Sequence, residues 1–206
     1  NSQEDIAEKM KEQAAWRIKT EPSKNARKGF IVIRDESEPD KHKYLVLLSK
    51  KPSRDDTFKW MLPGGYIKDG EDVKNGIFRE LEKEAGAEIS QLINRENGTL
   101  CHPQGDHKAS SFHTTHNFKK EVLYQFEGSE EASKVGFAVC KENWFIVTGI
   151  DGEEIEGVFR HGTVPLLWRD QKLNNHTVCK KPGHTPAKDK ETLVAEYKET
   201  YKQDDE

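Results

Sequence analysis

The sequence predicts an α+β fold in which strands and helices pack as a sandwich. Several short apolar runs have the length and composition of β-strands, and one strongly marked helix lies among them. Amphipathic helical patterns lie near both ends of the chain. A series of parallel βαβ units fits less well, because too few helices separate the strands.

The N-terminal segment, residues 1–27, is predicted to form a helical extension and a linker. Apolar residues recur at four-residue spacing among Glu and Lys, which is typical of an amphipathic helix over 1–20; they are Ile6, Met10, Ala14 and Ile18. The polar stretch that follows contains Pro22 and is typical of a linker.

One domain is predicted over residues 28–170. Its strands are expected in short runs rich in apolar and β-branched residues, at 28–34, 43–49, 118–128, 136–140, 143–150 and 162–168. The last run contains Pro165, which indicates an irregular strand. Residues 94–111 are polar and rich in Gly and His, so loops are expected there.

A C-terminal loop and helix are predicted over residues 171–206, either packed on the domain or extending from it. The helix is expected at 189–203, where Leu193, Tyr197 and Tyr201 lie on one stripe. This helix and the N-terminal one are candidates for binding a protein partner or for forming a homodimer.

The marked helix is predicted to begin near Asp72 and to end at Gly86. Glu71 and Asp72 suit the positive end of the helix dipole, and a glycine commonly ends a helix. At 100° per residue, Val73, Ile77 and Leu81 form the buried stripe.

The other face of this helix carries Glu80, Lys83 and Glu84, while Glu82 points away from them. Two carboxylates one turn apart repel each other, so they form either a tolerated exposed face or a set of hard oxygen ligands for Mg²⁺ or Mn²⁺. Spacing alone leaves both interpretations open.

Residues 65–87 resemble the Nudix box, G-x5-E-x7-R-E-U-x-E-E-x-G-U, where U is an aliphatic residue. The positions in register are Gly65, Glu71, Arg79, Glu80, Leu81, Glu84, Gly86 and Ala87. Lys83 is the one departure, because the family has glutamate there. With residue frequencies near 7%, the chance of so many matches is on the order of one in a million, so this is a strong family signal.

The resemblance implies the Nudix fold, an α/β/α sandwich with a mixed sheet between helices. It also implies a Mg²⁺- or Mn²⁺-dependent hydrolase that cleaves a phosphoanhydride bond by water attack. Glu80 and Glu84 would be metal ligands and Glu80 a possible base, while Arg79 would orient a carboxylate. Gly64 and Gly65 would shape the substrate loop.

Lys83 leaves two hypotheses open. A lysine in place of a ligand changes the local charge by two units, and unit charges ~4 Å apart interact by about 4 kcal/mol at an effective dielectric near 20. The first hypothesis is a hydrolase that uses fewer metal ions and a later carboxylate; the candidates are Glu127, Glu130, Glu154 and Glu156. The second is a protein that binds a nucleotide, an RNA 5′ end or a protein partner without turnover, with Lys83 contacting phosphate.

The sequence features that indicate a particular substrate are weaker than those that indicate the family. Lys50, Lys51 and Arg54 could bind phosphate or simply be solvated. The stretch 179–184 is similar to the C-x-K-P-x-H segment of the diphosphoinositol-polyphosphate and diadenosine-polyphosphate branch, although Tyr66 replaces that branch's third glycine. RNA 5′ ends are the alternative substrate.

His113 and His116 could face the cleft, but structural or exposed roles are commoner for such residues.

Composition excludes several classes. The net charge of −4 argues against a general binder of nucleic acids or membranes, and no apolar run is long enough to span a bilayer. Three widely spaced cysteines indicate neither a disulfide framework nor a zinc site, which favours a reducing intracellular compartment. The cytoplasm is expected, with mitochondrial and nuclear locations open because the chain begins at Asn1.

Overall fold

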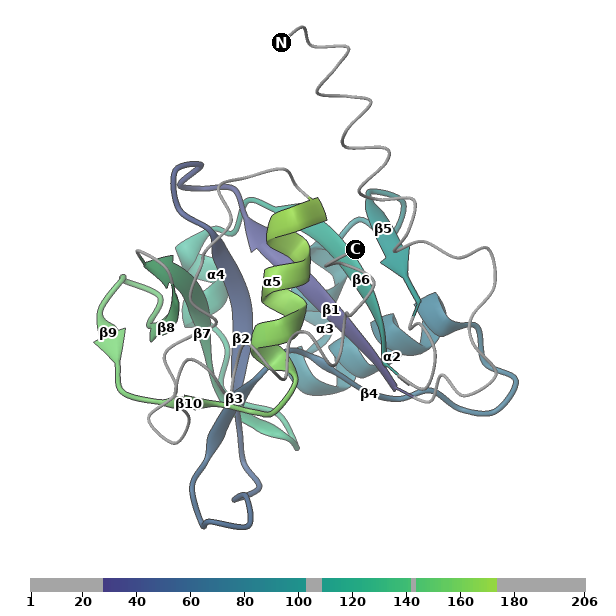
Figure 1. Cartoon of the computed structure of the whole chain (residues 1–206), viewed down its shortest axis with the longest axis horizontal. Coiled ribbons are helices and arrows are strands. Elements are labelled where there is room, and N and C mark those ends of the chain that lie inside the picture. The colour runs from purple at the N-terminus through teal and green to yellow at the C-terminus, as the bar shows by residue number, and fades with distance from the viewer. Residues whose placement is uncertain (1–27, 103–108, 142–143, 174–206) are drawn as a thin grey trace, which may run out of the picture.

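A mixed β-sheet lies between two helical layers (Figure 1), in a computed structural model that describes residues 28–102, 109–141 and 144–173. The strands run in the order β5-β6-β1-β2-β7-β8-β9. They are β5 (Gly98–Cys101), β6 (Ala109–His116), β1 (Lys28–Asp35), β2 (Lys43–Ser49), β7 (Ala132–Lys141), β8 (Trp144–Thr148) and β9 (Glu154–Ile155). Along this path β1 and β6 are parallel and the other neighbours are antiparallel.

The chain between β2 and the marked helix lies between β1 and β2, where these two strands separate. Strands β1 and β2 pair only at Arg34↔Tyr44 and Asp35↔Lys43. Beyond that point β3 (Lys59–Met61) pairs with β2, β4 (Gly64–Tyr66) pairs with β1, and β10 (Val158–Phe159) pairs with β3. Gly64 and Gly65, which belong to β4, are therefore held next to the central strand β1.

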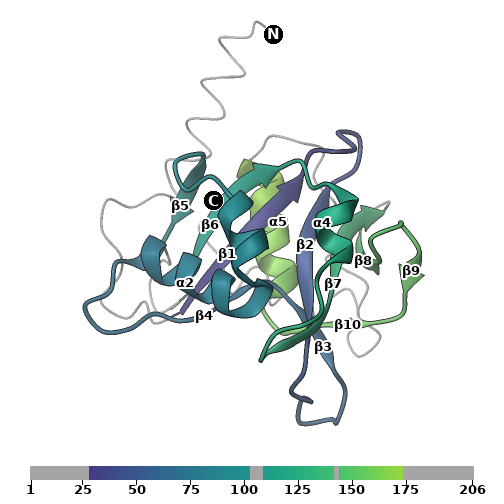
Figure 2. The same ribbon diagram turned by 180° about the vertical axis from the view of Figure 1, so that it is seen from behind.

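Helices cover both faces of the sheet. Figure 1 shows α5 (Thr163–Leu173) in front of it. Figure 2, seen from behind, shows α2 (Val73–Ala85), α3 (Ala87–Leu92) and α4 (Lys120–Tyr124) on the opposite face. This arrangement confirms the predicted fold class.

Strand β1 is buried on both faces, which explains its continuous apolar run. Ile31 and Ile33 belong to the core beneath α2, together with Ile77 of that helix. Val32 belongs to the second core, together with Trp168 of α5. The predicted buried stripe of α2 is confirmed.

The predicted strands at 28–34, 43–49, 136–140 and 143–150 correspond to β1, β2, β7 and β8. The strand predicted at 118–128 is wrong, because this segment contains α4. Phe118, Val122 and Phe126 recur every four residues and pack on the core beneath α2, which is a helical period.

The strand predicted at 162–168 is also wrong, because this run begins helix α5. Pro165 lies in the first turn, where the backbone N–H groups have no partner within the helix, so its missing N–H costs little. Residues 163–171 are all buried, and an apolar run buried on every side cannot be distinguished from a strand by periodicity.

The loop predicted at 94–111 contains β5 and the start of β6. Strand β6 escaped the prediction because polar residues fill it, and four of them are buried: Ser110, Ser111, His113 and Thr114. Each of them has a hydrogen-bond partner and can therefore be buried, so the apolar alternation that indicates a half-buried strand is missing.

Some predictions fall outside the described residues. These are the helices at 1–20 and 189–203, the linker between 1–20 and β1, and the stretch 179–184. The domain boundaries stay predictions, and α5 continues to Leu173. None of the helices in the described residues is long and apolar enough to cross a membrane.

The cysteines match the expectation only in part. Cys101 is a buried thiol. Cys140 is disulfide-bonded, which differs from the expectation that the cysteine spacing indicates no disulfide framework.

Candidate functional site

Two glycines let β4 lie directly against strand β1 and helix α2. A Cβ atom on Gly64 would overlap the backbone of Gly29 and Phe30 in β1. A Cβ atom on Gly65 would lie 2.8 Å from Oε2 of Glu80. Any larger residue would therefore displace either the central strand or the glutamate side chain.

Helix α2 is capped at both ends. The side chain of Asp72 accepts a hydrogen bond from the backbone N–H of Asn75 (3.1 Å), which makes Asp72 the N-cap. Gly86 has φ +87° and donates its backbone N–H to the carbonyl of Glu82, as expected for the end of the helix. Glu71 directly precedes this N-cap, which agrees with its expected place at the start of the helix.

Arg79 joins the loop to the helix. Its Nε donates to Oε2 of Glu71 (2.8 Å), and its Nη2 donates to Oε1 of Glu71 and to the carbonyl of Tyr66 (both 3.0 Å). Its Nη1 donates to Oε1 of Glu80 (2.9 Å). Hydrogen bonds from Arg79 and from the backbone of Lys68 lower the pKa of Glu71 to about 2. Arg79 thus lies where a residue that orients a carboxylate is expected.

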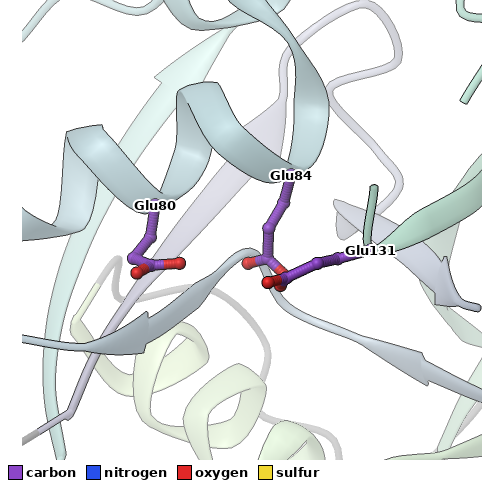
Figure 3. Close-up of side chains that lie close together, drawn as sticks. All are labelled: Glu80, Glu84 and Glu131. Atoms are coloured by element: carbon purple, nitrogen blue, oxygen red, sulfur yellow. The ribbon is translucent and has the colours of Figure 1, made fainter. Parts of the chain in front are cut away.

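Three carboxylates form one cluster, defined as Glu80, Glu84 and Glu131, whose potential ligand atoms all lie within 4.8 Å of one another. Figure 3 shows Glu80 and Glu84 projecting from the same side of α2 while Glu131 approaches from beyond them. Glu80 and Glu84 are buried, and Glu131 is half-buried. The backbone N–H of Gly64 donates to Oε1 of Glu84 (2.6 Å).

The pKa values of two carboxylates in the cluster are shifted in opposite directions. Burial raises the pKa of Glu84 to about 8, with a contribution from Glu131, although the N–H of Gly64 opposes the rise. Burial also favours a higher pKa for Glu131, but hydrogen bonds from Lys83 and Glu84 outweigh it, so the pKa of Glu131 is lowered. Carboxylates this close cannot all be ionised without a nearby cation.

Glu131 is the functional candidate that the sequence did not single out. The four residues considered there, Glu127, Glu130, Glu154 and Glu156, are all exposed, and Glu154 pairs with Lys141. Glu131 reaches α2 because the backbone N–H of Lys50 donates to its carbonyl (2.8 Å), which continues the pairing of β2 with β7. The only local signal is its position just before a strand.

Lys83 lies beside the cluster, as its helical position requires. Its Nζ is 3.1 Å from Oε1 of Glu131, and 46% of its side chain is exposed. The hydrogen bond and charge of Glu131 raise the pKa of Lys83. Glu82 is exposed on another face of α2, as expected.

The remaining candidates are more scattered. Lys50 is exposed at the end of β2, where its backbone contacts Glu131. Arg54 is exposed on the loop that follows, and its described contacts do not link it to the cluster. His113 binds Asp170 of α5, and His116 packs edge-on against the ring of Phe118, so neither joins the three glutamates.

Comparison with known proteins identifies the domain. A family model of the NUDIX domain matches residues 25–172. No curated protein sequence matches the chain.

Many solved structures match, at low identity. A Caenorhabditis elegans Ap4A hydrolase is 19% identical and covers 54% of this chain and 78% of its own, with a TM-score of 0.39. A MutT/nudix family protein from Enterococcus faecalis is 15% identical and covers 97% and 93%, with a TM-score of 0.43. An ADP-ribose pyrophosphatase from Streptococcus suis is 17% identical and covers 53% and 70%, with a TM-score of 0.31. Scores this low support no conclusion about substrate.

Proposed function

Because the chain belongs to the NUDIX domain family, we propose that it is a divalent-metal-dependent hydrolase of a phosphoanhydride bond in a phosphorylated small molecule. The observation that carries the proposal is the cluster of Glu80, Glu84 and Glu131, which lies against the glycines of β4. Glu131 supplies the carboxylate that position 83 lacks.

The cluster fits a small divalent cation. Its donors are carboxylate oxygens, the hard ligands that Mg²⁺ and Mn²⁺ prefer. Two of these carboxylates are buried next to each other, where a cation would relieve their repulsion. We therefore assign Glu80, Glu84 and Glu131 as the residues that would hold Mg²⁺ or Mn²⁺.

The side chains of the cluster have separate tasks in this proposal. The ion, when bound, would neutralise phosphate oxygens and make the attacking water more acidic. The backbone N–H of Gly64 holds Glu84 in place, and Arg79 holds Glu80 by its Oε1. The other oxygen of Glu80, Oε2, faces the space kept open by Gly65, and we assign it to accept the proton of the attacking water.

The bond changes are those of a simple hydrolysis. The oxygen of water bonds to phosphorus, its proton passes to Glu80, and the bond from phosphorus to the bridging oxygen breaks. The leaving group departs as the second phosphate. No oxidant or further reactant is needed.

The substrate is proposed at a coarser level. Nucleoside-diphosphate-linked, diphosphoinositol and dinucleoside polyphosphate compounds are the main candidates, and an RNA 5′ end is the alternative. The ammonium of Lys83 lies beside Glu131, which supports its proposed contact with phosphate, and Lys50, whose backbone bonds to Glu131, is retained as a second phosphate contact. Arg54, on the loop after β2, is retained as a third phosphate contact.

The test is hydrolysis of a substrate panel with Mg²⁺ or Mn²⁺. The panel includes ADP-ribose, a dinucleoside polyphosphate, a diphosphoinositol compound and triphosphorylated RNA. We expect Glu84→Gln to lower kcat/KM at least about 100-fold on the substrate that is turned over, because a metal ligand is lost. Glu82→Gln, on the exposed face of the same helix, is the matched control and should match the wild type. Equal activity of the two variants would refute the assignment of Glu84.

A binding protein without turnover is the second candidate, and one observation favours it. The ammonium of Lys83 already contacts Glu131, so part of the negative charge that would attract metal is compensated. In that case the panel yields no product, while calorimetry still detects binding of one of its compounds. Product formation by the wild type that is lost in Glu84→Gln would exclude this candidate.

A further inference from the structure

Lys83 contacts the cluster directly at Glu131, as Arg79 does at Glu80. Its Nζ lies 3.1 Å from Oε1 of Glu131, which is itself within reach of Glu80 and Glu84. Although 46% of the side chain is exposed, its charged end is bound to Glu131. The residue that breaks the family pattern is therefore part of the site, and it does not point away into solvent.

We propose that the ammonium of Lys83 takes the place of a second divalent cation, so that the site binds a single divalent ion. This inference rests on the proposed function, because it assumes that the cluster holds metal. It assigns Lys83 as a positioning residue that acts through Glu131. The family glutamate at this position would instead add a ligand.

Charge balance is the first step. Three carboxylates and one ammonium leave a formal charge of −2 in the site, which one divalent ion neutralises. A glutamate at position 83 would make this charge −4, which matches two divalent ions. Arg79 does not alter the comparison, because it also pairs with Glu71 through two hydrogen bonds.

Geometry is the second step. Lys83 directly precedes Glu84 on α2, and Glu131 comes from the loop before β7 on the other side of the cluster. The ammonium thus bridges the helix and the loop that supply the carboxylates. A point charge with three N–H donors on a flexible stem can hold Glu131 in this position without coordinating anything itself.

The experiment measures metal binding without substrate. Isothermal titration calorimetry with Mn²⁺ gives the number of bound ions and their affinity, and the spectrum of bound Mn²⁺ checks the number. We expect one ion in the wild type and in Lys83→Arg, which keeps the cation. Lys83→Glu should bind two ions. Lys83→Gln should bind one ion about tenfold more tightly, because a nearby positive charge is removed.

A charge-matched control separates local from global effects. Lys141 lies at the far end of β7, ten residues after Glu131, which is roughly 33 Å along the strand. Lys141→Glu makes the same change in net charge as Lys83→Glu, and we expect it to bind one ion with the wild-type affinity. Circular dichroism establishes that each variant is folded.

The outcomes distinguish this inference from the proposed function. One ion in Lys83→Glu, or unchanged affinity in Lys83→Gln, would overturn the role of Lys83 and leave the hydrolase proposal intact. Two ions in the wild type would do the same. A wild type that binds no Mn²⁺ would overturn the metal site itself, and with it both proposals.

Discussion

Two polar clusters lie on opposite faces of the same sheet, and they differ in how their charge is balanced. Beneath α2, the cluster of Glu80, Glu84 and Glu131 brings three groups of one charge together. Beneath α5, Nδ1 of His113 lies 2.9 Å from Oδ1 of Asp170, and its Nε2 lies 2.8 Å from the hydroxyl of Ser111. In the second cluster each group has a hydrogen-bond partner of a different chemical type.

This difference supports our proposal that the first cluster is the functional site and the second a structural one. The order Ser111, His113, Asp170 resembles that of a nucleophile, a base and an acid. However, all three are buried, and Ser111 is fully so, which leaves no path for a substrate. Buried groups that satisfy one another stabilise a fold, whereas carboxylates gathered close together favour the binding of a cation.

Glu80→Gln is the largest expected effect and tests the functional side of the comparison. We expect kcat/KM to fall about 1,000-fold, because the variant loses both a proposed ligand and the proposed base. The free energy of unfolding should stay the same or rise, since repulsion within the cluster is relieved. Steady-state kinetics and urea unfolding measure the two quantities. A variant that loses stability and keeps its activity would place Glu80 among the structural residues.

Asp170→Asn tests the structural side. We expect the free energy of unfolding to fall by about 1–3 kcal/mol, because His113 loses a charged partner in the core. Below the unfolding transition, kcat should be that of the wild type. Thermal unfolding and kinetics at low temperature check this prediction. Loss of kcat with unchanged stability would mean that the α5 cluster takes part in catalysis.

Gly65→Ala tests how strongly activity depends on the position of a single carboxylate oxygen of the functional cluster. The added methyl would press on Oε2 of Glu80, so we expect kcat/KM to fall about tenfold through displacement of that carboxylate. Gly70→Ala is the useful contrast, because its Cβ would meet no atom within 4 Å and only its φ of +76° would be strained. It should lower stability more than activity. Equal kinetic effects would show that contact with Glu80 is not the cause.

Acid stability is the smallest expected effect. The pKa of Glu71 falls from its ordinary 4.5 to about 2 through its hydrogen bonds with Arg79. Its stabilising contribution is therefore complete above pH 4.5 and is lost as the pH falls toward 2. Glu71→Gln should reduce this part of the acid dependence of unfolding. Parallel stability curves for the variant and the wild type between pH 4.5 and 2 would contradict the assignment.

The elements that could be predicted from the sequence are those whose stabilising contacts lie close together along the chain. The α2 frame was predicted because its glycines, caps and buried stripe lie within one stretch of chain. Strand β6 was missed because its buried polar residues have hydrogen-bond partners, and the partner of His113, Asp170, is far away in sequence. Helix α5 was assigned to a strand because burial on all sides removes the periodic signal.

The sequence by itself determined the family frame, the helix with Glu80 and Glu84, and the anomaly at Lys83. These depend on turn chemistry and on a period of 3.6 residues, which act locally. Only the tertiary structure decided that Glu131 completes the cluster and that Lys83 binds it. The physical reason is that pairing β2 with β7 brings the loop before β7 to the side of α2, and a pairing register is a long-range property.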